Sequence, residues 1–271
     1  MKNIANVIKY SIREALSSKI LISYLALSLL IVVVVLIAVA IKGPLSYIDE
    51  NIPPEILETE KTSIINIIFA VVAGFLSFFT SFLAIFPVAG FVPGINDKGS
   101  LDMLLSKPVG RSEFLTGRYL GGLLIVGVNF AFVITAVWLI ISVSTSIWNP
   151  SFLYIIPFNL LSFAALYALM FPLGLITGSN LTGILTYFIL LIIVNPLLLI
   201  GHSAEKFTGV LKTVISAFYY VLPKTAELGS TALDSALKGD PFSQFLPLIT
   251  TLAFTVLVFL YGIFIFEKKD F

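Results

Sequence analysis

The chain has 271 residues, of which 58% are hydrophobic and 11% are charged, and its net charge is +1. The charged fraction is less than half of the roughly 25% found in soluble globular domains. This composition excludes a sizeable soluble domain and predicts an all-helical integral membrane protein with several spans. The small net charge gives no reason to expect nucleic-acid binding.

Residues that commonly hold cofactors are scarce. The chain has no cysteine, one histidine (His202) and three methionines. Disulfides and Cys-ligated metals are therefore excluded, and the soft and imidazole ligands are too few for a copper or haem path. We expect no metal and no other cofactor on the chain itself.

Residues 1–19 precede the first span and have the pattern of an amphipathic helix, with Lys9 and Arg13 on the polar face. A basic amphipathic helix at this place is typical of an interfacial helix on the cytoplasmic side. A cleaved signal peptide is the alternative, because residues 38–40 read Ala-Val-Ala. The apolar run before them is longer than the roughly 7–15 residues of a signal-peptide core, which favours the interfacial helix.

Six apolar stretches are long enough to cross a bilayer. They are residues 20–41, 64–92, 119–147, 154–176, 183–200 and 245–266. Pro87 predicts that the second stretch is kinked or continues beyond the membrane, and Asn195-Pro196 interrupts the fifth.

Residues 201–244 are too many for a connection without secondary structure. An apolar stripe from Phe207 to Phe218 predicts one amphipathic helix, Pro223 ends it, and Thr225 to Leu237 predicts a second. We expect both helices on the outer face. They form either an external gate or partner-docking surface, or a lid that only packs on the spans.

A polar island at residues 97–118 separates the second and third spans. Leu101, Leu104 and Leu105 share one face of a short helix, and Pro108 ends that helix.

A second helix is expected to restart at Gly110 or Arg111, with Glu113 at the acidic position of a capping box, and to run into the membrane. The alternative is an ordinary amphipathic loop on the lipid headgroups.

The distribution of basic residues predicts the topology. If both termini and the island lie on one side, that side carries ten Lys and Arg residues and the other side carries six. The positive-inside rule then places both termini and the island in the cytoplasm. The tail Glu267–Phe271 fits a basic membrane stop better than a dilysine retrieval signal.

The spans carry no ionisable residue at their centres, which counts against a secondary carrier and an intramembrane protease. The chain also lacks the G-x-x-x-x-G-K-[ST] phosphate-binding loop, so we expect no enzyme activity.

Neutral polar residues and small residues do occur within the spans. Four asparagines are expected mainly to bond between helices, with a substrate role less favoured, and two Gly-x-x-x-Gly pairs permit close helix approach. These residues are Asn66, Asn129, Asn159 and Asn195, with Gly117, Gly121, Gly174 and Gly178.

Residues 99–115 read GSLDMLLSKPVGRSEFL and resemble the cytoplasmic loop of ABC-2 type transporter permeases. That loop has an acidic residue, Gly-Thr-Leu, Leu-Leu-Ser-x-Pro, Ser-Arg-x-Glu and Gly-Lys. Ser100 stands for the Thr, Gly110 for the Ser, and Arg118 for the Lys. The segment is most similar to the branch that includes the nitrous-oxide-reductase maturation permease.

The resemblance implies one permease domain over residues 1–271, in the cell membrane, with an N-terminal elbow helix. It implies that the island is a coupling helix that docks on a separate ABC ATPase, which binds ATP and Mg²⁺, and that the permease is a homodimer. The implied coupling residues are Asp97, Gly99, Ser100, Leu101, Leu104, Leu105, Pro108, Arg111 and Glu113.

Two other functions remain open. The chain could be a non-transporting subunit that transmits ATPase motion to an extracytoplasmic maturation partner through residues 201–244. A secondary carrier is the less favoured alternative.

Overall fold

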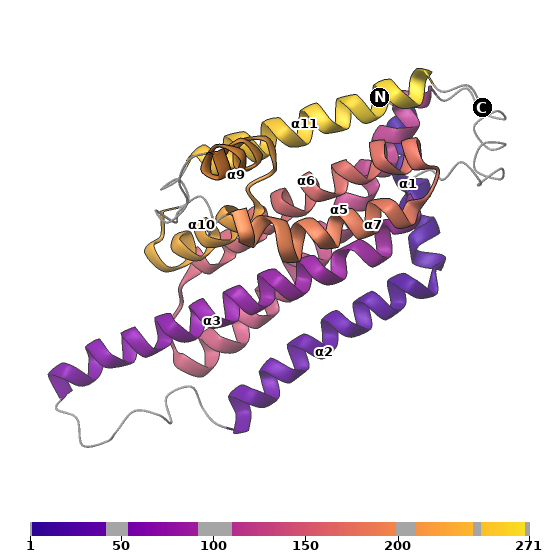
Figure 1. Ribbon diagram of the computed structural model, residues 1–271. Coiled ribbons are helices and arrows are strands. Elements are labelled where there is room, and N and C mark those ends of the chain that lie inside the picture. The colour runs from indigo at the N-terminus through magenta and orange to yellow at the C-terminus, as the bar shows by residue number, and fades with distance from the viewer. Residues whose placement is uncertain (1, 42–53, 92–109, 199–209, 241–244, 269–271) are drawn as a thin grey trace.

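The computed structural model describes residues 2–41, 54–91, 110–198, 210–240 and 245–268, which are almost entirely helical and contain no strand (Figure 1). The α-helices are α1 (Lys2–Ser17), α2 (Lys19–Ile41), α3 (Pro54–Val88), α5 (Arg111–Thr145), α6 (Ile155–Thr177), α7 (Asn180–Ile189), α9 (Val210–Val221), α10 (Thr225–Lys238) and α11 (Phe245–Lys268). Three short segments complete the described part of the chain: the 3₁₀ turns η1 (Ala89–Phe91) and η2 (Pro150–Tyr154), and the π-turn η3 (Leu190–Val194).

Six helical segments of this part of the chain are long and apolar enough to cross a membrane, which confirms the expected all-helical membrane architecture. They are Lys19–Ile41, Asn66–Phe91, Arg111–Thr145, Pro150–Thr177, Asn180–Leu198 and Phe245–Lys268. About two thirds (67%) of the apolar part of Pro150–Thr177 is buried, against 11% for α2 and 17% for α11. Helix α6 is therefore the centre of the bundle, and α2 and α11 lie at its periphery.

A break at Ser18 separates the amphipathic helix from the first span. The Ser18 hydroxyl donates to the carbonyl of Ala15 at 2.7 Å and accepts from the amide of Leu21 at 3.2 Å. One side chain thus closes the end of α1 and caps the start of α2, because a serine oxygen can satisfy an otherwise unpaired amide in the first turn.

Two prolines change the helical geometry near them. After Pro87, α3 tightens into the 3₁₀ turn η1, which ends at Phe91. Before Pro196, the fifth span widens into the π-turn η3, where the side-chain amide of Asn195 donates to the carbonyl of Leu190 at 2.9 Å. The predicted interruption of the fifth span therefore exists, as a wider turn with an added side-chain bond.

The structure confirms the expected second helix of the island, because α5 begins at Arg111 and continues without a break through the third span to Thr145. The preceding residues 97–109, where the first short helix was expected, lie outside the described part of the chain.

The structure shows how some of the predicted Gly-x-x-x-Gly residues and span asparagines are used. Gly178 ends α6 in the left-handed conformation (φ 68°), and its amide donates to the carbonyl of Gly174. Asn129 does bond between helices: its side-chain oxygen accepts from the buried hydroxyl of Ser28 on α2 at 3.0 Å.

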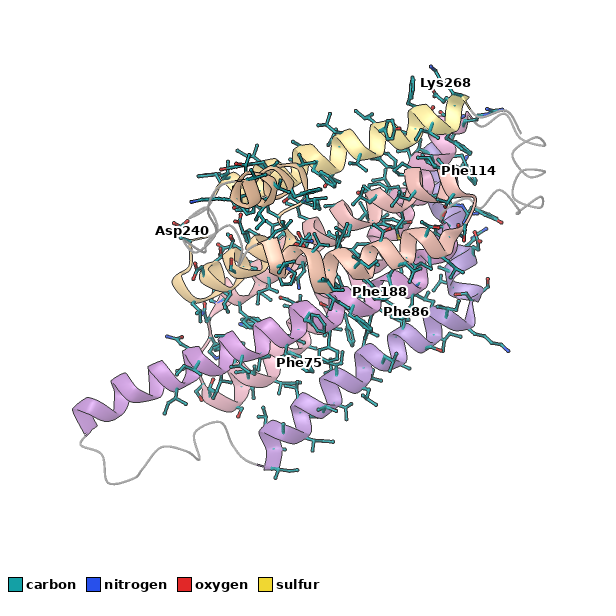
Figure 2. The ribbon with its side chains drawn as sticks, viewed as in Figure 1. Phe75, Phe86, Phe114, Phe188, Asp240 and Lys268 are labelled. Atoms are coloured by element: carbon teal, nitrogen blue, oxygen red, sulfur yellow. The ribbon has the colours of Figure 1, made fainter. Side chains whose placement is uncertain are left out.

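Both chain ends lie at one end of the bundle, beside the start of α5 (Figure 1). The opposite end holds η2, α9 and α10 (Figure 1). Figure 2 shows the same division, with Phe114 and Lys268 at one end and Asp240 at the other. This common location of the two termini is the arrangement that an even number of spans requires.

Candidate coupling site

The candidate site is the start of α5, the part of the predicted coupling region that the structure describes. Arg111 and Glu113 belong to it. The other predicted coupling residues lie outside the described residues: Asp97, Gly99, Ser100, Leu101, Leu104, Leu105 and Pro108. The geometry at the start of α5 therefore shows what the island is attached to.

Glu113 joins the first turn of α5 to the first turn of α1. Its carboxylate accepts from the side-chain amide of Asn3 at 2.9 Å and from the backbone amide of Gly110 at 3.2 Å. The first of these bonds, then the second, holds the pKa of Glu113 below its ordinary value. The predicted capping role of Glu113 is confirmed, but Gly110 has no side chain to return the bond.

Arg111 joins the same turn to the other end of the chain. Its guanidinium donates to the backbone carbonyl of Glu267, in the last turn of α11, at 3.2 Å. Carbonyls in the last turn of a helix have no partner within the helix, and a cation is favourable there. Two residues of one helical turn thus contact both ends of the chain.

Gly117 and Gly121 form the surface of α5 on which α1 packs. A β-carbon added at Gly117 would lie 2.5 Å from Cβ of Val7, and one at Gly121 would lie 2.9 Å from Cβ of Ser11. Both pairs have the same sequence offset as Asn3 and Glu113, so the two helices run in the same direction. The predicted close approach at this Gly-x-x-x-Gly pair is therefore confirmed, and its partner is α1.

Arg118 is the buried charge of the site, with a relative exposure of 4%. Its guanidinium forms an ion pair with Glu14 of α1 at 2.5 Å. The guanidinium carbon also lies 5.5, 5.4 and 5.3 Å from the ring centroids of Tyr10, Phe91 and Phe114. These distances suit cation–π attraction, which is stronger when water is excluded.

The contact between Arg118 and Phe91 bridges the island. Phe91 is the last described residue before the island, at the end of the second span, and Arg118 is the last residue of the island, in the second turn of α5. Arg118 therefore connects α1, η1 and α5 at one point.

Sequence reasoning did not select Arg118 as a site residue. It appeared only at the Lys position of the family motif, in a polar island where a solvated side chain is the usual expectation. One signal could have identified it, because Glu14 is the single acidic residue of an otherwise basic amphipathic helix.

The described residues of the site offer packing contacts and charge. Among the described residues, no group of three or more His, Cys, Asp or Glu side chains could hold a metal ion.

Comparison with known proteins identifies the family. The family model described as ABC-2 family transporter protein matches residues 5–271 and names no branch within the family. A comparison with curated proteins gives no match. Since the family model covers nearly the whole chain and six helices are suited to cross a membrane, the chain belongs to the ABC-2 transporter family and is a membrane-spanning permease.

Proposed function

We propose that this chain is the membrane subunit of an ATP-driven exporter, and that a separate ABC ATPase docks on residues 97–118. The observation that carries this proposal is the attachment of the first turn of α5 to both ends of the chain, through Arg111 and Glu113. A force applied to the island would reach α1, α5 and α11 together.

The continuity of α5 supports this mechanism. A helix without a break from Arg111 to Thr145 moves as one rod, because each turn is bonded to the next. Glycine contacts fix α1 to that rod, and Arg118 ties it to the end of the second span at Phe91. Closure of the ATPase dimer would then rock the second and third spans between inward-facing and outward-facing states.

The island residues have separate roles in this proposal. Leu101, Leu104 and Leu105 form the face that packs on the ATPase, with Asp97, Gly99 and Ser100 at its start, and Pro108 sets the angle to α5. The sequence predicted Arg111 and Glu113 as docking contacts. Because both already bond within the chain, we propose that they chiefly hold the island in position.

The orientation and assembly are also proposals. The excess of basic residues favours a cytoplasmic location for both termini and the island. Assembly as a homodimer with two ATPase copies follows from the resemblance of the island to ABC-2 permeases.

A second candidate function is the transmission of ATPase motion to an extracytoplasmic partner through residues 201–244. The packing of α10 favours it, because Leu228, Ala232 and Ala236 are fully buried in the bundle. The adjoining α9 exposes Val210, Phe218 and Val221. A role in nitrous-oxide-reductase maturation stays a prediction from the resemblance of the island.

The test is co-purification of the chain with a candidate ABC ATPase. We expect the wild type to retain the ATPase and a Leu104→Asp, Arg111→Glu double variant to lose it while still inserting into the membrane. Lys212→Glu, which changes an exposed cation of α9, is the control and should retain the ATPase. Equal retention by the double variant and the wild type would contradict docking at the island. Transport that stops without ATP and resumes with it would separate export from mechanical transmission.

A further inference from the structure

A cavity of about 300 Å³ lies between α3, α6 and α10, near the end of the bundle opposite to the chain termini. Its size falls at the lower limit of small-molecule sites, which are about 300–1,000 Å³. Most of its lining surface is apolar, and the polar side chains that line it are hydroxyl groups and one carboxamide, from Ser77, Ser81, Asn159, Ser162, Thr225 and Ser230.

Asn159 is the residue that indicates a ligand. It is 3% exposed, and its side-chain amide nitrogen has no hydrogen-bond partner among the described residues. An unsatisfied buried donor costs about 1–3 kcal/mol, so it is usually retained where something else completes the bond. That nitrogen has almost no accessible surface in the structure, so a rotation of the Asn159 side chain would be needed to present it to a ligand oxygen in the cavity.

The described lining of the cavity carries no charged side chain. The adjoining Lys224 and Glu227 line a separate, much smaller cavity, where the Lys224 amino group lies 4.2 Å from the ring centroid of Tyr219. A charged ligand would therefore enter without a compensating charge, which is costly at low dielectric.

Apolar groups and open space complete the site. The rim includes the half-exposed ring of Phe78, a face on which the C–H groups of a ligand can pack. Gly74 and Gly229 also line the cavity, and a β-carbon at either would meet no atom within 4 Å. The neighbouring side chains thus leave this space unfilled.

We propose that this cavity binds an uncharged, hydroxyl-bearing small molecule about the size of a monosaccharide. The lining offers both donors and acceptors for hydroxyl groups, an apolar ring, and no charge. A role of this ligand as cargo rests on the proposed export function. Binding does not, and it can be measured on the isolated chain without ATPase or ATP.

The absence of cysteine from the chain makes a direct test available. In Ser162→Cys, the single thiol lies inside the cavity, and in the control Ser230→Cys it lies at the exposed rim. The purified variants in nanodiscs are treated with neutral hydroxyethyl, anionic sulfonatoethyl and cationic trimethylammonium-ethyl methanethiosulfonates. Relative to the rim control, we expect the neutral reagent to label the inner thiol about tenfold faster than either charged one, because of the cost of burying charge.

Protection by a ligand probe is the second readout. D-Glucose should slow the labelling of Ser162→Cys severalfold, whereas glucose 6-phosphate, its charged counterpart, should not. Adding Gly229→Leu should remove this protection by filling the cavity. Adding Gly90→Leu, which also places a side chain in open space but outside the cavity, should preserve it.

Three results would each overturn the proposal. They are equal rates for all three reagents at the inner thiol, labelling that D-glucose does not slow, and protection that persists with Gly229→Leu. Loss of ATPase co-purification, by contrast, would leave these measurements unchanged and would count only against the proposed export function.

Discussion

Arg118 of α5 and Glu14 of α1 form an ion pair at the point where the chain leaves the island, with 2.5 Å between Nη1 and Oε2. The arginine side chain is 5% exposed and the glutamate side chain 40%. A cation that is almost fully desolvated is thus neutralised by an anion that water still reaches. This difference in exposure determines how much stability a substitution of Glu14 should cost.

Glu14→Gln should lower the stability of the protein by about 1–2 kcal/mol. Removal of one partner from a fully buried pair costs about 3–5 kcal/mol, but water around Glu14 reduces the loss. A thermal melt of the detergent-purified protein would measure it as a lower Tm. Arg13→Gln, at an exposed position of the same helix, removes a charge away from the site and should leave Tm nearly unchanged. Equal shifts for the two variants would show that the ion pair contributes nothing specific.

Hydropathy alone was enough to predict the helical class and the number of spans, because a long apolar run in a membrane protein has few alternatives. The start of α5 was also predictable, since Pro108 and Glu113 act on neighbours close in sequence. The contact of Gly117 and Gly121 with α1 was not. Two glycines four residues apart define a flat surface, but they do not say which helix lies on it.

The burial of Arg118 and the position of Asn159 could not be predicted for the same reason. Each depends on groups that are distant in sequence: Glu14 and Phe91 around the arginine, and Ser77 on another helix near the asparagine. The periodicity of the sequence predicts which side chains share a helix face. The burial of a side chain depends on which other helices pack against that face.

Gly117→Ala should disturb the packing of α1 on α5. Its new methyl group would lie 2.5 Å from Cβ of Val7, and overpacking of this kind costs about 1–3 kcal/mol. The matched control is Gly127→Ala on the same helix, whose methyl group would meet only Leu160 at an ordinary 3.4 Å. We expect a lower Tm for the first variant and an unchanged or slightly higher Tm for the second. A similar Tm for both would mean that α1 does not approach α5 this closely.

The bond between Asn3 and Glu113 predicts an effect of acid on stability. Because the pKa of Glu113 is lowered in the folded protein, the ionised carboxylate stabilises the fold at any pH above its ordinary value, about 4.3. That contribution is lost as pH falls through the lowered pKa. Measured as Tm against pH, Glu113→Gln should lose less stability below pH of about 4 than the wild type does.

Asn3→Ala provides the check on this interpretation. It removes the largest cause of the lowered pKa while it keeps the carboxylate, so it should weaken the acid dependence in the same direction. If Tm falls with pH in Glu113→Gln and in Asn3→Ala as it does in the wild type, the bond between Asn3 and Glu113 is not the cause of the loss of stability in acid.

The corner between α9 and α10 gives the last prediction. The hydroxyl of Tyr219 donates to Glu227, and burial of the tyrosine, followed by this bond, raises the pKa of Tyr219. The amino group of Lys224 lies above the same ring and is almost fully buried, with Glu227 at 3.9 Å. Tyr219 therefore contacts both charged groups of the corner.

Tyr219→Phe keeps the ring but deletes the bond to Glu227, at a cost of about 1 kcal/mol or more. The corner should then open more often, and trypsin should cut after Lys224 severalfold faster than in the wild type. Tyr220→Phe keeps the ring 5.1 Å from the Lys224 amino group and does not alter the bond between Tyr219 and Glu227, so it should be cut at the wild-type rate. Mass spectrometry of timed digests would distinguish the two variants. If neither is cut faster, the hydroxyl of Tyr219 does not control access to Lys224. If only Tyr219→Phe is cut faster, the bond between Tyr219 and Glu227 holds α9 and α10 together at this corner.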